Sequence, residues 1–439
     1  MRLHVVMAAA LLLVPAADHA SSAAPPVGTV SVTPAPCDGA NPSACPYYWH
    51  EPQDRFYTVF VNGEESFVYQ GENPPQCSGG YKAQPGHCAS QWNVQSQSYT
   101  MVSADFSSAD TSIEVRVVTT HGRLARKPFV EPRVVARFGQ GAPAEKVSGT
   151  GEYVFSVSSA GHYSVELFGQ GAGLRDALLL FVDNELEGIS PDCPVPVGGG
   201  RLYRFTGPNI SNPSNPSWAN TGYYAFDALT VRPGDVVCLE RGAWVEGHLV
   251  QDPERGCTGH NIRVAGKGVW SGQAIIGKTP AEDRRPLIQL CGANITVSGI
   301  TTANSLAANI ELSPYWYDGY HEVLPGEMQA QRGGNRIDNV KALSTWWYST
   351  DGLYAGPWGE VANSFVMVND DSLKPMARHT TVRDCTVWQG DNGWSVMVGW
   401  NTGTQETGMS VKNVHVIHVG HWAGVEHTLF STSSCIFFF

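Results

Sequence analysis

The chain has 439 residues, with 47 glycines, 28 prolines and only 15% charged residues. This composition favours a turn-rich β protein, and the length suggests about two to three domains. The formal charge of −12 and the lack of a Lys/Arg run exclude a surface that follows a phosphate backbone or an anionic membrane. We therefore expect neither nucleic acid nor a membrane as a partner.

The N-terminus has the order of a secretory signal peptide. Arg2 precedes an apolar run over residues 5–17, and small residues follow at Ala20, Ala23 and Ala24. The run is too short to span a bilayer. We expect residues 1–24 to be a signal peptide that is removed, and the mature protein to be secreted.

All ten cysteines lie beyond this segment, which fits an oxidising compartment and disulfide bonds. Cys37 with Cys45, and Cys77 with Cys88, are close enough in sequence for local bridges. Cys291 and Cys385 lie inside apolar strand patterns, where a buried free thiol is at least as well supported as a disulfide.

Residues 25–200 are expected to form a β-sandwich. Alternation over 57–61, the Asn62-Gly63 turn and a return strand beginning at 67–69 predict a hairpin. Alternation over 153–157 and 163–167, around a turn at 158–161, predicts a second hairpin. A further alternating strand at 113–117 makes a sandwich the economical interpretation.

Residues 201–439 show a different pattern, in which short strands begin with a polar residue and end at a turn former. Proline, glycine, asparagine and serine are concentrated at 190–220, which marks the junction. The irregular separations of the short strands fit one or two coils of about 20 to 30 residues in a parallel β-helix. Asparagines at the bends could then form hydrogen bonds along the stack. A second β-sandwich with irregular loops is the alternative. The strand segments are 261–264, 294–297, 339–342, 381–384 and 413–416.

Three carboxylates in this second part carry the chemistry. Asp351 lies nineteen residues before Asp370, and Asp371 follows directly. Adjacent coils are about 4.8 Å apart, so we expect Asp351 and Asp370 to project from neighbouring coils with carboxyls roughly 5 to 9 Å apart. Asp370 and Asp371 can both face one cleft only if the chain bends there, and Asn369 favours such a bend. Paired acids at this separation are typical of glycoside hydrolases.

Tryptophans are concentrated around the acids, with eight of the thirteen between residues 316 and 422. Their faces suit the apolar C–H faces of sugar rings, so a polysaccharide is the expected partner. Candidate substrate-binding residues are Lys374, Trp347, Tyr354, Trp400 and Trp316. About half of the tryptophans are expected to be structural instead. We expect no cofactor and no metal, and a monomer.

The chain resembles glycoside hydrolase family 49, the dextranase and isopullulanase family. The resemblance rests on four strings in this order: Thr350-Asp351-Gly352, Val368-Asn369-Asp370-Asp371-Ser372-Leu373-Lys374, Met397-Val398-Gly399-Trp400 and Val414-His415-Val416-Ile417-His418. It implies an all-β chain, with a β-sandwich followed by a right-handed, pectin-lyase-like parallel β-helix. It also implies inverting hydrolysis of an α-glucan such as dextran or pullulan, with Asp370 as general acid and Asp351 and Asp371 activating water.

The chain departs from the family pattern at three places. Tyr354 stands where a subgroup has glutamate, and Pro375-Met376 stands where an aromatic residue is usual. The sequence also ends at residues 431–439, where the family continues through further coils, so the solenoid is expected to be truncated at its C-terminus.

Three other functions remain open from the sequence. A polygalacturonase also uses Asp-Gly and Asp-Asp motifs in a β-helix, but the Gly-His-Gly and Arg-Ile-Lys strings that bind uronates do not occur here. A pectate lyase fits less well, because it needs metal-binding acids and an arginine base. A non-catalytic glycan-binding β-helix is the alternative from a different class.

Overall fold

A computed structural model describes parts of the chain between residues 30 and 431. Nearly all the ordered elements in these parts are strands, with one short 3₁₀ helix, η8 (Gln273–Ile275). No helix in the described parts is long and apolar enough to cross a membrane. The predicted all-β class is confirmed. The described residues are 30–35, 56–71, 97–107, 111–119, 133–136, 145–147, 151–166, 177–184, 193–208, 222–251, 259–275, 285–312, 334–344, 350–390, 393–398, 408–419 and 430–431.

The N-terminal strands form two sheets that share one core, as a β-sandwich requires. One sheet contains β1 (Val30–Ser31), β4 (Tyr69–Gly71), β5 (Gln97–Ala104), β7 (Arg133–Ala136), β10 (Gly161–Glu166) and β11 (Leu178–Asn184). The other contains β2 (Tyr57–Val61), β3 (Glu64–Ser66), β6 (Ile113–Thr119), β8 (Glu145–Val147) and β9 (Glu152–Val157).

The first predicted hairpin forms with a tighter turn than expected. Asn62 and Gly63 both have left-handed φ angles, 48° and 84°, as a two-residue hairpin turn demands. The return strand is therefore β3, which starts at Glu64, and not a strand beginning at 67–69. Tyr69 instead starts β4, which belongs to the other sheet.

The second predicted hairpin is wrong. β9 pairs with β6 and β8, whereas β10 pairs with β7 and β11. The turn at 158–160 thus crosses from one sheet to the other. The alternating pattern is the same in both arrangements, because Phe155 and Tyr163 face a common core from opposite sides.

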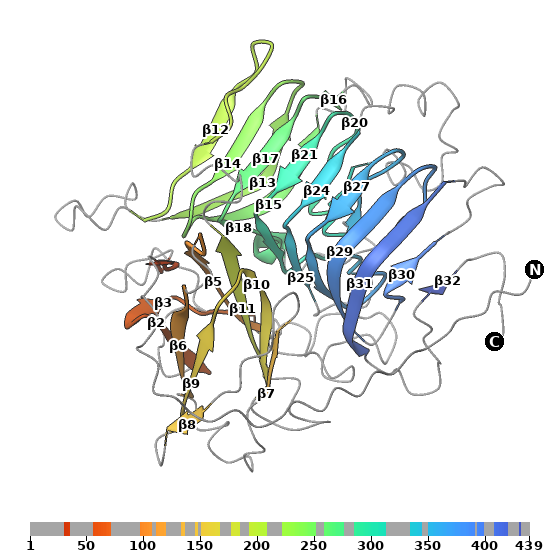
Figure 1. Ribbon diagram of the computed structural model, residues 1–439. Helices are drawn as coiled ribbons and strands as arrows, with labels where there is room; N and C mark the ends of the chain where they lie inside the picture. The colour runs from red at the N-terminus through yellow and green to blue at the C-terminus, as the bar shows by residue number, and fades with distance from the viewer. Residues whose placement is uncertain are drawn as a thin grey trace, which may run out of the picture.

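The C-terminal strands stack in parallel coils, as Figure 1 shows from β12 to β31. Each coil contributes to three faces. The first face contains β12 (Leu202–Phe205), β14 (Val236–Leu239), β17 (Arg263–Gly266), β21 (Thr296–Ser298), β24 (Arg336–Asp338), β27 (Glu360–Ala362) and the starts of β29 (Thr381–Gln389) and β31 (Ser410–Val419).

The second face contains the starts of β13 (Tyr223–Val231) and β15 (Trp244–Gln251), then β18 (Val269–Ser271), β22 (Thr301–Ala303), β25 (Lys341–Ser344), β28 (Phe365–Val368) and the ends of β29 and β31. The third face contains the ends of β13 and β15, then β19 (Ile288–Gln289), β23 (Ile310–Glu311), β26 (Leu353–Tyr354), a bridge at Leu373, β30 (Val396–Met397) and β32 (Phe430–Ser431). A side pair, β16 (Gly259–His260) and β20 (Gly292–Ala293), completes the stack.

Coil length varies more than the sequence pattern suggested. On the first face one coil takes 21 residues from Glu360 to Thr381 but 40 from Thr296 to Arg336. The segments at 294–297 and 339–342 are not equivalent positions, because Thr296 belongs to the first face and Lys341 to the second. Equal spacing is unnecessary, since insertions leave the stack at its corners.

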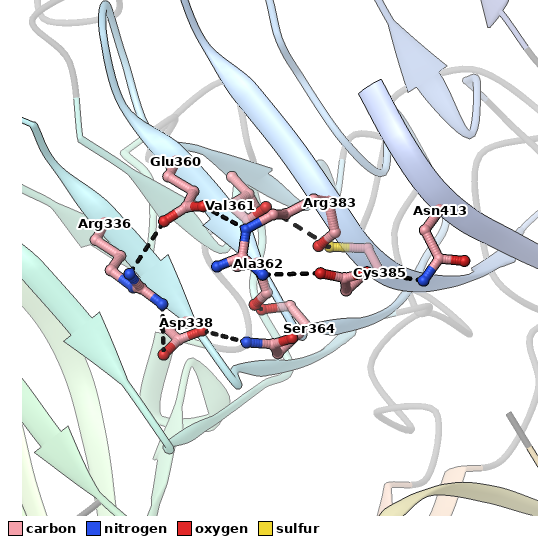
Figure 2. A network of polar contacts seen from close by, with 11 residues as sticks. Arg336, Asp338, Glu360, Val361, Ala362, Ser364, Arg383, Cys385 and Asn413 are labelled. Atoms are coloured by element: carbon pink, nitrogen blue, oxygen red, sulfur yellow. Dashed lines mark hydrogen bonds and ion pairs between the residues drawn. The ribbon is translucent and has the colours of Figure 1, made fainter. Parts of the chain in front are cut away.

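Asparagines at the corners form the hydrogen bonds that the sequence predicted. Asn261, Asn294, Asn363 and Asn413 all adopt left-handed φ angles between 48° and 58°. The side-chain amide of Asn294 donates to Asn261, and those of Asn363 and Asn413 donate to acids of the preceding coil. Figure 2 shows the outer surface of the first face, where Arg336, Glu360 and Arg383 form a ladder of ion pairs.

The sandwich packs on the second face of the stack. Apolar side chains from β4, β5 and β11 form one buried cluster with Trp244, Leu343, Phe365 and Trp388. Trp388, only 1% exposed, is therefore a structural tryptophan. His418 of β31 contacts Glu166 of the sandwich at 2.6 Å across this interface.

The cysteines differ in part from expectation. Cys193 and Cys238 form a disulfide that ties the segment before β12 to β14. Cys385 is a buried free thiol, but Cys291 is disulfide-bonded. Of the two alternatives that the sequence left open, Cys385 has the free thiol and Cys291 the disulfide. The expected bridges of Cys37 and Cys77, the signal peptide and the tail after 431 lie outside the described residues.

Candidate active site

The three acids meet at the corner between the second and third faces. The amide of Gly352 donates to the carbonyl of Asp371 at 2.8 Å, and Leu353 bridges to Leu373. Asp351 and Asp371 are therefore the residues in register on adjacent coils, twenty positions apart. Asp370 lies one residue earlier, where its amide donates to the carbonyl of Thr350.

Asp351, Asp370 and Asp371 each place a carboxylate oxygen within 4.8 Å of the others. The expected bend is present, since β28 ends at Val368 and the amide of Asp371 donates to Asp370 Oδ1 at 2.9 Å. Both neighbouring acids thus face one site. The prediction gave 5 to 9 Å between the carboxyl groups of Asp351 and Asp370, whereas 4.8 Å is the limit between single oxygens of the three acids. The residue that stacks on Asp351 is Asp371, and not Asp370.

Lys374 supplies positive charge inside the cluster. Its side chain is 4% exposed, and its Nζ donates to Asp351 Oδ2 and lies 4.0 Å from Asp371 Oδ2. Burial alone would lower the pKa of Lys374, but Asp351 and Asp371 outweigh burial and raise it. Although the spacing of the three carboxylates could suit a cation, Lys374 already provides the charge that a bound ion would bring.

Asp370 is the acid of this cluster whose pKa is raised. Burial raises its pKa well above the usual range, and the negative charges of Asp351 and Asp371 raise it further. Lys374 offsets only part of this effect. A protonated carboxyl beside ionised ones is the arrangement that general acid catalysis requires.

Buried polar side chains fix the position of Asp351. The amide and the Nδ2 of Asn309 both donate to the carbonyl of Asp351, at 2.9 and 2.8 Å. Asn309 Oδ1 in turn accepts from the hydroxyls of Thr302 and Ser344. This buried network links two adjacent coils and holds the acid without touching its carboxylate.

Two further contacts hold the other acids. Gln389 Nε2 donates to the carbonyl of Asp370 at 2.9 Å, while its Oε1 accepts from Ser372. The amide of Trp394, on the next coil, donates to Asp371 Oδ1 at 3.1 Å. Sequence reasoning did not single out these supports, because their partners come from different coils.

The predicted substrate-binding residues divide into two groups. Lys374 joins the acids, whereas Tyr354 is 3% exposed and packs with Met376, Met397 and Trp394. Tyr354 therefore forms part of the apolar support beside the site. The three predicted tryptophans lie outside the described residues: Trp316, Trp347 and Trp400.

Glu311 is a fourth acid that the sequence analysis missed. Glu311 lies on the coil before that of Asp351, and it pairs there with Tyr354 of the next coil. Its exposed fraction is 1%. Within the described part of the chain, neither of its carboxyl oxygens has a hydrogen-bond partner. Burial raises its pKa well above the usual range, Lys374 lowers it and Asp351 raises it. Glu311 is a single acid in an apolar strand, so the sequence gave no sign that it lies near Lys374 and Asp351.

Known proteins resemble the chain in sequence and in fold. No family model matches the chain. Dextranases from Arthrobacter sp. (strain CB-8) and Arthrobacter globiformis are each 25% identical over 281 residues, which cover 60% of this chain. The solved structure of Dex49A from Penicillium minioluteum matches 85% of this chain and 75% of its own, with a TM-score of 0.54 and 16% identity.

These findings confirm the resemblance to glycoside hydrolase family 49. The structural match shows that the chain shares the fold of Dex49A, and the sequence matches show that it is similar to dextranases. The matched region spans 42% of the length of each Arthrobacter dextranase.

Proposed function

We propose that the protein is a glycoside hydrolase that cleaves an α-glucan, with dextran the first candidate and pullulan the second. The observation that carries this is the cluster of three acids around Lys374, in which burial and neighbouring charges raise the pKa of Asp370. The matches to dextranases support the choice of substrate.

In the proposed reaction, Asp370 protonates the oxygen of the leaving sugar. Asp351 and Asp371 position the water that attacks the anomeric carbon, and one of them accepts the proton that this water loses. Lys374 offsets their charge and holds Asp351 in place. The buried network through Asn309 keeps this arrangement in position before substrate binds.

Release of reducing sugar from a panel of dextran, pullulan, nigeran and polygalacturonate tests the proposal. We expect activity on dextran or pullulan, and its loss in Asp370→Asn. Activity on polygalacturonate alone would favour the polygalacturonase alternative. Binding of a glucan without any cleavage would favour the glycan-binding alternative.

We propose that hydrolysis inverts the anomeric configuration, as the family resemblance implies. Inverting acid pairs are commonly about 6.5 to 9.5 Å apart and retaining pairs about 5 to 5.5 Å apart. The 4.8 Å here is measured between one oxygen of each carboxyl group, which is a shorter measure than the separation of the groups themselves. NMR of the first product, recorded within minutes of mixing, should show the β anomer; an α product would contradict inversion.

We also propose that the protein is secreted. The disulfide between Cys193 and Cys238 and the bonded Cys291 support an oxidising compartment. Expression in the native host should place the protein in the medium, with its N-terminus near residue 25. An intact Met1 on protein inside the cell would contradict this proposal.

A further inference from the structure

Two aromatic residues occupy backbone positions that favour glycine. Trp358 has a φ of 53° and His379 a φ of 58°, both in the left-handed region. For a bulky side chain this conformation is a true outlier that raises the free energy of the fold. Such strain at an ordered position points to a role for the side chain.

The same corner of the neighbouring coils carries glycine. The register of the first face aligns Gly334, Trp358, His379 and Gly408, each two residues before a paired strand position. Gly334 and Gly408 have φ angles of 65° and 76°. The corner therefore demands a left-handed residue in every one of these coils, and two of them carry rings where glycine would be unstrained.

The two rings lie together at the surface. Their centroids are 5.5 Å apart with an angle of 31° between the planes. Trp358 is half-buried and His379 is exposed. A Cβ on Gly408 would lie 2.2 Å from His379 Nδ1, so the glycine also leaves room for this ring. Together the rings form an aromatic surface that extends over two coils.

This pair lies at the opposite edge of the third face from the acids. Trp358 follows Asp351 by seven residues and His379 follows Lys374 by five, with the two strand positions of the third face between them. Seven residues reach at most about 25 Å, so one polysaccharide chain can contact both the acids and the rings.

The surface beside the rings suits a neutral sugar. Glu360, two residues after Trp358, pairs with Arg336 at 3.1 Å and with Arg383 at 2.5 Å. As Figure 2 shows, these guanidinium groups are already engaged by carboxylates of the protein. They are thus poorly placed to bind the carboxylate of a uronate, while the rings match the apolar face of a hexose.

We propose that Trp358 and His379 form a remote subsite that binds a neutral glucose residue of the substrate chain, away from the bond that is cut. This inference rests on the proposed α-glucan hydrolysis. The rings add affinity for long chains, and short oligosaccharides that end before the corner gain nothing from them.

Substitution by glycine gives a sharp test, because it removes the ring and relieves the strain together. Trp358→Gly should raise KM for dextran roughly tenfold, the loss expected for one aromatic contact. The effect should diminish with isomaltotriose. His379→Gly should act in the same direction. Asn363→Gly is the matched control, since Asn363 is a left-handed corner residue without a ring, at φ 50°.

Affinity electrophoresis in gels containing dextran or polygalacturonate gives a measurement that needs no hydrolysis. We expect dextran to retard the wild-type protein and Asn363→Gly, and to retard Trp358→Gly much less. Wild-type protein that is retarded but cleaves no glucan would refute the proposed reaction and leave the subsite standing. Unchanged KM and retardation in Trp358→Gly, with a lower unfolding temperature, would show that the rings only pack and would overturn the subsite.

Discussion

At the scale of single residues, two acids have raised pKa values in different surroundings. Asp370 is raised in pKa by burial and by the charges of Asp351 and Asp371, which places its proton beside ionised partners. Glu311 is raised in pKa mainly by burial, and among the described residues its carboxyl group lacks a hydrogen-bond partner. The first acid can transfer a proton in a reaction, whereas the second affects the stability of the fold.

Asp370→Asn tests the assignment of the general acid. We expect kcat on dextran to fall by about 10² to 10⁴, the usual contribution of a positioned acid. The fall should be much smaller on an aryl glycoside, whose leaving group needs no proton. In the wild-type enzyme, activity should decline as pH rises through the raised pKa of Asp370. Asp338→Asn on the outer surface of the first face is the control; equal losses in both variants would contradict the assignment.

Glu311→Gln should stabilise the protein at neutral pH. Because its pKa is raised in the folded state, the carboxyl group favours folding below its unfolded pKa and loses this contribution as pH rises to the folded pKa. The amide variant has no such loss, so its advantage should grow by up to about 1.4 kcal/mol per pH unit in that window. Calorimetric unfolding at a series of pH values, with the exposed Glu114→Gln as control, measures it. A difference that does not change with pH would contradict a raised pKa.

At the scale of elements, the corners and the buried polar residues between coils keep the strands in register. The corner asparagines accept a left-handed backbone and donate to the coil before them. Asn309 links two adjacent coils in the interior and fixes the carbonyl of Asp351. Exposed and buried asparagines thus serve the same stacking in different ways.

Asn309→Ala should reduce both stability and activity. It leaves the Asp351 carbonyl and the hydroxyls of Thr302 and Ser344 without their partner, which should cost at least about 2 kcal/mol. The displaced Asp351 should also lower kcat. Urea unfolding and kcat on dextran measure the two effects. Asn413→Gly, at an exposed left-handed corner, should change both far less. Normal activity in a destabilised Asn309→Ala variant would show that this network stabilises the fold without positioning Asp351 for the reaction.

At the scale of the whole molecule, charged groups pair within the interface between the sandwich and the stack. Lys341 of β25 is 1% exposed and contacts Asp183 of β11 at 2.9 Å. Burial alone would raise the pKa of Asp183, but Lys341 and Asn339 outweigh burial and lower it. The pair therefore stabilises the native state above the unfolded pKa of an aspartate and loses its effect as pH falls through the lowered value.

Lys341→Met should destabilise the protein by about 3 to 5 kcal/mol, because it leaves a buried carboxylate unpaired. The double variant Lys341→Met/Asp183→Leu should recover most of this loss. Urea unfolding near neutral pH compares the wild-type protein with both variants. A double variant as unstable as the single one would show that packing, and not the unpaired charge, causes the loss.

The sequence by itself determined the features that depend on neighbouring residues. Alternation predicted strands in the first part, short runs with a polar start predicted strands in the second, and asparagine positions predicted the bends between coils. The Asp370-Asp371 motif, with a bend favoured by Asn369, indicated acids that face one site. Each of these depends on local backbone geometry or on a short motif, which the chain carries wherever it folds.

Only the tertiary structure decided which residues meet across coils and sheets. Glu311 lies 43 residues before Tyr354 in register, and Asp351 stacks on Asp371 after only twenty. Loops of unequal length set these offsets, so no sequence period reveals them. The crossing between β9 and β10 was hidden for a related reason, since the same alternation faces the core from either sheet. Long-range partners are set by how the three-dimensional stack buries its apolar surface, and that choice is not written in any single segment.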